Sequence, residues 1–338
     1  MSNMSEVKIP HRLEQDFLLP FFQELRNAQS EQHVFIDFTP LSYSFPLSML
    51  VAGSYLRQWI KIRKENGLDT TEKGIDDTNY VHTYLMHLGF FNFIGIDRGK
   101  QIGEATGSTR YLPIRRITRS ELEEYARACK EKILDAIEFQ SKSLANILSA
   151  PTANIQDLNT YSYAIREILR NVFEHSGADE CFLCGQRWQD GKAQIAILDE
   201  GCGIYETIKQ AYNANNDEEA IKLSVQPGIT RTKSFSDEEN IHGNSGYGLY
   251  VLSQLGSSFG WFSIGSGSSR LTCESQNERI DNFDFNGTFL GVHLNRTLHS
   301  FRDVLKDIIS EGEKDAQAKG RRRLASSVSK SLSFTDND

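Results

Sequence analysis

The sequence lacks a long apolar run and an excess of positive charge, and each absence excludes a class of protein. No stretch approaches ~18 consecutive apolar residues, the length of a membrane-spanning helix. The 37 lysines and arginines are outnumbered by 45 aspartates and glutamates, and the formal net charge of -8 argues against general affinity for nucleic acid or anionic membranes. The first residues hold no apolar core followed by a small-residue cleavage site, so we expect no secretory signal. These features favour a cytoplasmic protein, and 338 residues are enough for two domains.

Cysteine is also scarce. The five cysteines, at irregular spacing, do not have the pattern of a disulfide framework. Cys181 and Cys184 form the only C-x-x-C pair, and no second pair or histidine cluster lies near them in the sequence. Burial of both in a strand is the favoured interpretation, and a zinc or redox site is the alternative.

Residues 1–118 have the pattern of a small α/β domain. Apolar residues before Thr39 and Pro40 predict a buried strand, and the apolar periodicity that begins at Pro46 predicts a long helix with proline in its first turn. The expected elements are, in order, a strand at 33–38, a helix at 46–66, a polar loop at 65–77, a helix ending at Gly89 and a strand at 109–119.

Three further segments follow in the chain. Residues 119–150 are predicted to be a helical connector, with Ser120 and Glu123 as its capping box. Residues 151–300 alternate helices and strands, which favours an α+β sandwich with helices on one face of a mixed sheet. Its strands are expected at 180–189, 193–201, 260–265, 269–275 and 287–294. Residues 301–338 should form a C-terminal helix and, beyond about 318, a disordered polar tail.

The stretch YAIREILRNVFEHSG is predicted to be a helix with an unusual polar edge. Glu167 and Asn171 lie one helical turn apart and share a face. A buried glutamate would cost several kcal/mol unless it were paired. A site that activates water beside a metal would use both side chains, since a carboxylate can orient or deprotonate water and a carboxamide oxygen suits Mg²⁺.

Three glycine-containing motifs follow this helix. In LDEGCGI, an apolar strand ends at Asp199, and the next glycines permit a tight turn and close approach of the backbone to a flat ligand. In GNSGYGLY, glycines lead into a helix whose first N–H groups can bind an anion. In NGTFLGV, Gly287 and Thr288 stand at the start of a strand.

The ordered set E-x-x-x-N, D-x-G-x-G, G-x-G-L and G-T, over about residues 150–297, resembles the ATP-binding Bergerat fold of the GHKL superfamily. That superfamily includes gyrase-type topoisomerases, heat-shock chaperone ATPases, MutL mismatch-repair proteins, histidine kinases and anti-sigma-factor kinases. The resemblance implies that Glu167 is the catalytic base or water positioner and that Asn171 coordinates Mg²⁺ bridging the phosphates. Arg170 would touch a phosphate, and His175 is expected to make a structural hydrogen bond rather than to act in catalysis.

The remaining motif residues take roles from the same resemblance. Asp199 would bind the adenine amine, Thr288 would support the adenine through a water, and the backbone N–H groups of the G-x-G-L motif would bind phosphate. The implied cofactor-binding set is Arg170, Asn171, Asp199, Gly201, Gly203, Gly246, Gly248, Leu249 and Thr288. Residues 205–245 would be an ATP lid, with Lys222, Arg231, Lys233 and His242 as candidate phosphate contacts.

Two features of the sequence disfavour particular classes within the GHKL superfamily that it resembles. No histidine lies between residues 119 and 165, which disfavours a standard sensor histidine kinase, and the short stretch after the ATP domain disfavours the gyrase and MutL classes. Residues 34–59 resemble a STAS-type segment, the usual partner of anti-sigma-factor kinases. Phe45 to Leu47 occupy the place of its usual Asp-Ser-Ser, so the phosphate acceptor would be missing or displaced to Ser44 or Ser48.

The sequence therefore predicts a Mg-ATP-binding regulatory protein, either a slow ATPase or a Ser/Thr protein kinase. The alternative is a non-catalytic, ATP-gated interaction module. The expected ligands are ATP and Mg²⁺, and the expected partner is an unidentified protein, with a homodimer compatible with the resemblance. Membrane and general nucleic-acid partners are not expected.

Overall fold

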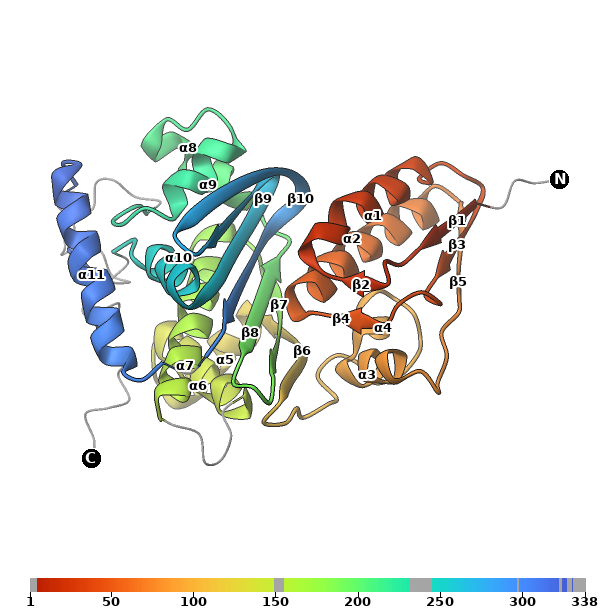
Figure 1. Cartoon of the computed structure of the whole chain (residues 1–338), viewed down its shortest axis with the longest axis horizontal. Helices are drawn as coiled ribbons and strands as arrows, with labels where there is room; N and C mark the ends of the chain where they lie inside the picture. The colour runs from red at the N-terminus through yellow and green to blue at the C-terminus, as the bar shows by residue number, and fades with distance from the viewer. Residues whose placement is uncertain are drawn as a thin grey trace. The chain divides into compact units, whose positions relative to one another are not determined.

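The computed structural model describes residues 5–148, 155–230, 245–296, 298–321, 324–326 and 330 (Figure 1). The chain forms two compact units: residues 1–107 with 112–116 and 182–186, and residues 108–111 with 117–181 and 187–338. Among the described residues, none of the helices has the length and apolar character that crossing a membrane requires.

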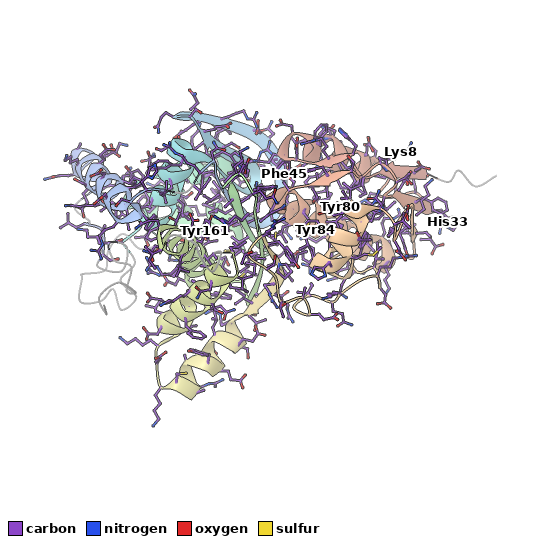
Figure 2. The ribbon with its side chains drawn as sticks, turned by 60° about the horizontal axis from the view of Figure 1, so that its bottom comes forward. Lys8, His33, Phe45, Tyr80, Tyr84 and Tyr161 are labelled. Atoms are coloured by element: carbon purple, nitrogen blue, oxygen red, sulfur yellow. The ribbon has the colours of Figure 1, made fainter. Side chains whose placement is uncertain are left out.

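The first unit is built on a parallel sheet of order β1-β3-β5, formed by Ser5–Lys8, His33–Asp37 and Asp69–Lys73. Lys8 and His33 mark β1 and β3 in Figure 2. A small parallel pair joins β2 (Arg12–Leu13) to β4 (Tyr43–Ser44). The helices are α1 (Gln15–Asn27), α2 (Pro46–Glu65), α3 (Tyr80–Leu88) and α4 (Phe90–Phe93).

Most predicted elements of this unit are confirmed, with two corrections. The predicted strand and long helix are β3 and α2, and α3 ends at Gly89 in a left-handed conformation. The stretch predicted as a polar loop contains β5, an exposed edge strand whose polar residues carry no apolar alternation. The strand predicted at 109–119 is confirmed as β6 (Tyr111–Thr118), although it pairs with β7 and does not join the β1-β3-β5 sheet.

Arg63 is the polar centre of the first unit. This side chain is fully buried at the end of α2. Its guanidinium donates to the carbonyl oxygens of Ala28 and Gln29 at 3.0 Å, and also to those of Glu31 and Asp69. These carbonyls lie in the connections that follow α1 and precede β5, so one buried cation satisfies the backbone of two connections.

A five-stranded sheet has the order β6-β7-β8-β10-β9. Its other strands are β7 (Glu180–Arg187), β8 (Ala193–Asp199), β9 (Gly260–Glu274) and β10 (Asn277–Leu294). The helices are α5 (Arg119–Cys129), α6 (Ile133–Leu148), α7 (Ile155–Asn171), α8 (Gly203–Tyr212), α9 (Asp217–Ser224), α10 (Gly248–Phe259) and α11 (Phe301–Ala318). Helices α7 and α10 lie side by side against β8, β9 and β10 (Figure 1).

The expectation of a mixed sheet is wrong, because the sheet is antiparallel. Short hairpins join β7 to β8 and β9 to β10, and a short hairpin can only connect antiparallel strands. The β9–β10 turn places Ser275 and Gln276 at positive φ, as a tight hairpin requires. Strand β6 runs antiparallel to β7, since Arg187 N–H donates to Arg110 and Arg119 N–H donates to Asp179.

Three element boundaries also differ from those predicted. The strands predicted at 260–265 and 269–275 are one strand, and β10 begins ten residues before Gly287 because the polar hairpin tip gave no strand signal. The predicted connector is two helices, separated at Lys130 in a left-handed conformation. Its capping box is formed by Thr118 and Glu121, not by Ser120 and Glu123.

We expect Arg63→Met to destabilise the protein by about 3 kcal/mol or more, because several buried carbonyl oxygens lose their donor. Lys61→Met is the matched control on the same helix, since Lys61 is exposed and makes only a surface ion pair with Glu65. Urea denaturation of both variants measures the difference. Equal stability of the two variants would contradict the role given to Arg63.

Candidate functional site

A large cavity opens within the second unit. Its volume, including the open solvent at its mouth, is about 950 Å³. The lining residues come from the end of α7 and the turn after it, the end of β8, helix α8, residues 224–230, the start of α10, and strands β9 and β10. Segments far apart in the sequence therefore form one enclosed site.

The structure brings the predicted site residues together. The cavity is lined by Glu167, Arg170, Asn171, Asp199, Gly203, Gly246, Gly248, Leu249 and Thr288. The prediction that Glu167, Asn171, Asp199 and Gly248 line one cavity is thus confirmed, while their roles toward a ligand stay predictions. Gly201 is not in the lining, but its N–H donates to the Asp199 carboxylate at 2.9 Å.

Glu167 is buried and paired, with only 4% of its surface exposed. Arg166 donates to Glu167 Oε1 through Nη2 at 3.0 Å and through Nε at 3.2 Å. Arg170 Nη1 lies 4.0 Å from the same oxygen. A buried carboxylate needs such partners, because removing one partner of a buried ion pair costs about 3–5 kcal/mol. Sequence reasoning missed Arg166, which has no motif of its own.

Arg170 is held between two carboxylates. Its Nε donates to Glu174 Oε1 at 3.0 Å, and Glu167 lies on its other side. Burial lowers the pKa of Arg170, but the charges of Glu167 and Glu174 outweigh it, so this pKa is raised. The guanidinium is therefore a fixed positive charge at the wall of the cavity.

A π-helical turn, Val172–Ser176, follows α7 directly. Such turns are rare and are frequently found at functional sites. Both Glu174 and His175 of this turn line the cavity, so His175 lies at the site, as its place in the motif suggested. The amide nitrogen of Asn171 is buried and has no hydrogen-bond partner among the described residues. A ligand in the cavity could satisfy this group.

Asp199 ends β8 as a largely desolvated carboxylate. Burial raises the pKa of Asp199 to about 6, although hydrogen bonds from the Gly201 N–H and the Ser176 hydroxyl oppose the shift. Thr288 is its partner on the neighbouring strand β10, so two predicted site residues are fixed opposite each other by sheet register.

Two glycines of the site are required by close backbone contacts. A Cβ at Gly248 would lie 2.3 Å from Glu167 Oε2, and a Cβ at Gly246 would lie 2.3 Å from the carbonyl oxygen of Ile229. Helix α10 begins at Gly248 without a side-chain cap. Its first N–H groups are therefore available to an anion.

Ser266 connects two of the predicted motifs and was missed in the sequence. Its hydroxyl donates to the carbonyl of Gly287 at 2.9 Å and accepts the N–H of Ile204 at 2.9 Å. Also missed were the apolar wall residues Ile197, Ile204, Ile208, Ile229, Ile264 and Leu290. They come from five separate segments, so no local pattern could have revealed them.

Other predicted residues lie elsewhere. Within residues 205–245, predicted as a lid, the described part forms most of α8 and all of α9. Lys222 pairs with Glu218 on the surface and does not line the cavity. Arg231, Lys233 and His242 lie outside the described residues.

Cys181 and Cys184 are buried in β7, as expected, and burial raises the pKa of both thiols well above its usual value. Residues three apart in a strand point to opposite faces, so these two thiols do not share one metal ion. Among the described residues, no cluster of three or more His, Cys, Asp or Glu side chains could hold a metal by itself.

Of the two alternatives for the phosphate acceptor, missing or displaced, burial disfavours displacement to Ser44 or Ser48. Ser48 is 1% exposed, and the hydroxyl oxygen of Ser44 is buried. Packing at the start of α2 therefore leaves neither hydroxyl accessible to a kinase.

Comparisons with protein-family models, curated proteins and solved structures gave no match to this chain.

We expect Asp199→Asn to be more stable than the wild type near neutral pH and to lose this advantage in acid. The folded protein raises the pKa of this carboxyl from 3.8 to about 6, so between these values the folded state binds the proton more tightly than the unfolded state. This stabilisation is fully present below the unfolded pKa and is lost as pH rises through about 6, which costs the wild type up to about 3 kcal/mol. Urea denaturation of both proteins across this pH range is the measurement. A variant less stable than the wild type at every pH would show that partners stabilise the ionised carboxylate.

Proposed function

We propose that the second unit binds Mg-ATP and acts as a slow ATPase or Ser/Thr protein kinase in a regulatory switch. The observation that carries this proposal is that four motifs, spread from Glu167 to Thr288, line one cavity. The two ends of the cavity differ in chemistry: Asp199 is a buried hydrogen-bond acceptor at one end, and Arg170 is a buried cation at the other. Such a cavity suits a ligand with a base at one end and phosphates at the other.

The base would lie against β8 and α8. The Asp199 carboxylate can accept a hydrogen bond from an exocyclic amine, and the surrounding isoleucines offer apolar contact to a flat ring. Thr288, opposite Asp199 on β10, carries a hydroxyl at the same end of the cavity. These groups favour an amine-bearing base such as adenine.

The phosphates would lie at the start of α10. The N–H groups of this helix and the guanidinium of Arg170 supply positive charge at one edge of the cavity. The carboxamide oxygen of Asn171 would be the ligand for a magnesium ion, which is commonly held by few protein oxygens together with phosphate. Its buried amide nitrogen, which has no partner among the described residues, would donate to a phosphate oxygen. When bound, the ion would supply charge neutralisation of the phosphates.

Glu167 would hold the water or the acceptor hydroxyl that attacks the terminal phosphate. Arg166 donates to its Oε1, and a Cβ at residue 248 would lie 2.3 Å from its Oε2, so the carboxylate packs against the start of α10. This packing fixes its direction, which serves positioning. In the proposed reaction, Glu167 would accept the proton of the attacking oxygen as the new bond to the terminal phosphorus forms, and the bond between that phosphorus and the oxygen of the leaving ADP breaks.

The second candidate function is an ATP-gated interaction module with negligible turnover. The contacts of Arg166 and Arg170 to Glu167 favour it, because a carboxylate that pairs with two buried cations has a structural role apart from any chemistry. In either case we propose that the switch acts on a protein partner. The support for a protein partner is that segment 34–59 resembles a STAS-type segment, the usual partner of anti-sigma-factor kinases.

We expect Glu167→Gln to bind ATP within about three-fold of the wild type and to lose phosphate release by about 100-fold or more. Glutamine keeps an oxygen that can accept from Arg166, so this change removes the carboxylate charge and keeps the hydrogen bond, and urea denaturation checks that the variant is folded. Calorimetric titration with ATP and Mg²⁺, with phosphate assayed in the same samples, is the measurement. Asp199→Asn is the control that should lose binding.

Three outcomes separate the candidates. ATP binding with slow phosphate release by the wild type supports the ATPase or kinase. ATP binding with neither phosphate release nor phosphate transfer to added protein supports the module. An absence of ATP binding by folded wild-type protein would overturn the proposed function.

We expect Asn171→Ala to lose most of the gain in ATP affinity that Mg²⁺ provides, a change of about ten-fold or more. The affinity measured with a chelator in place of Mg²⁺ should stay the same, because the proposed contact is to the ion. Asn146→Ala on the exposed side of α6 is the matched control. An equal loss of affinity with and without Mg²⁺ would show that Asn171 does not act through the metal.

A further inference from the structure

Helix α11 packs on the wall of the cavity-bearing unit. Its buried side faces α10, next to which it lies in Figure 1. The contact is close at Gly312, where a Cβ would lie 2.4 Å from the ring of Tyr250. Tyr247, the residue before α10, is fully buried, and its pKa is raised to about 12 by burial and by the nearby charge of Glu313 on α11. The end of the predicted phosphate-binding motif is therefore covered by α11.

Two segments, which we call the wall segments, lie beside this helix: residues 226–230 and 245–248. Their backbones touch, since Gly228 N–H donates to the carbonyl of Gly246 at 3.1 Å. Ile229 and Thr230 of the first segment, and Gly246 and Gly248 of the second, line the cavity. The two wall segments thus form one side of the site and depend on each other for position.

Arg321 connects the C-terminal part of the chain to the first wall segment. The chain turns at Gly320, at a φ of 73°, after α11 ends. Arg321 N–H then donates to the carbonyl of Ala316 at 2.8 Å, which fixes the turn. Its Nη1 donates to the carbonyl of Pro227 at 3.1 Å, and its Nη2 donates to the side chain of Gln226.

We propose that Arg321 is a positioning residue for the nucleotide site: together with α11 it holds both wall segments in the arrangement that binds the ligand. The inference rests on the proposed function for the identity of the ligand. Its basis is that Arg321 donates to the first segment at 226–227, while α11 packs at Gly312 against Tyr250, two residues beyond the second segment. A partner that displaced α11 would therefore release nucleotide without touching the cavity.

Arg321→Ala tests this inference in the full-length protein. The variant loses donors to both a backbone carbonyl and a side chain, and we expect ATP to bind about ten-fold more weakly. Hydrogen exchange of the ligand-free protein should become faster in the wall segments, while exchange in α7, β8 and β10 stays unchanged. Arg321→Lys should recover part of the affinity, because an ammonium can still donate to Pro227.

Lys319→Ala is the matched control. Lys319 lies at the same end of α11 and makes an exposed ion pair with Asp315, with no contact to a wall segment. We expect this variant to keep the wild-type affinity and exchange pattern. The control separates the specific contact from a general loss of positive charge.

Two results would overturn the inference. In the first, Arg321→Ala would leave the exchange of the wall segments and the affinity for ATP unchanged. In the second, it would accelerate exchange throughout the unit, which is the result of a general structural role. If folded wild-type protein bound no ATP, the proposed function would fail, and the exchange measurements would still decide whether Arg321 holds the wall segments.

Discussion

The site depends on the burial of one carboxylate against a helix start. Glu167 can occupy this position only because Arg166 and Arg170 neutralise it and because residue 248 has no side chain. Arg166 is in turn within 4.0 Å of Glu138 on α6, so the network reaches a third helix. Charges buried this deeply are stable only in fixed geometry. The spacing of α7 and α10, and with it the width of the cavity, is set by this contact.

The two carboxylates of the cavity are in opposite electrostatic situations. Glu167 is paired with cations, whereas Asp199 is desolvated and has hydrogen-bond donors and the charge of Glu200 near it. The two ends of the cavity therefore differ, because one carboxylate is compensated by cations and the other is not. A ligand that donates hydrogen bonds at one end and carries negative charge at the other would complement both. Under the proposed function, this difference would place the base of the nucleotide toward Asp199.

The sequence predicts what is local or regularly spaced, and it misses what tertiary contacts create. Glu167 and Asn171 could be predicted as neighbours because helix periodicity places them on one face. The glycines of the motifs could be predicted because each marks a turn or a helix start. Ser266 and Arg321 could not be found, since each acts on residues reached only through folding, and Arg166, although it directly precedes Glu167, has no motif that marks it as a partner. The polar β5 and the tip of β10 lack apolar alternation, so their residues gave no strand signal. The antiparallel direction of the strands follows from the short hairpins between them, and the length of these hairpins could not be predicted from the sequence.

Three features that disfavour stability meet in this cavity. The π-helical turn departs from regular helix geometry, α10 begins without a side-chain cap, and Asp199 is a desolvated carboxylate. A structural role would explain any one of them, but a stable fold gains nothing from collecting all three around an open space. Under the proposed function, a ligand would compensate two of them, because phosphate would accept from the helix start and an amine would donate to Asp199. The grouping of these features around one cavity therefore supports the proposal of a binding site.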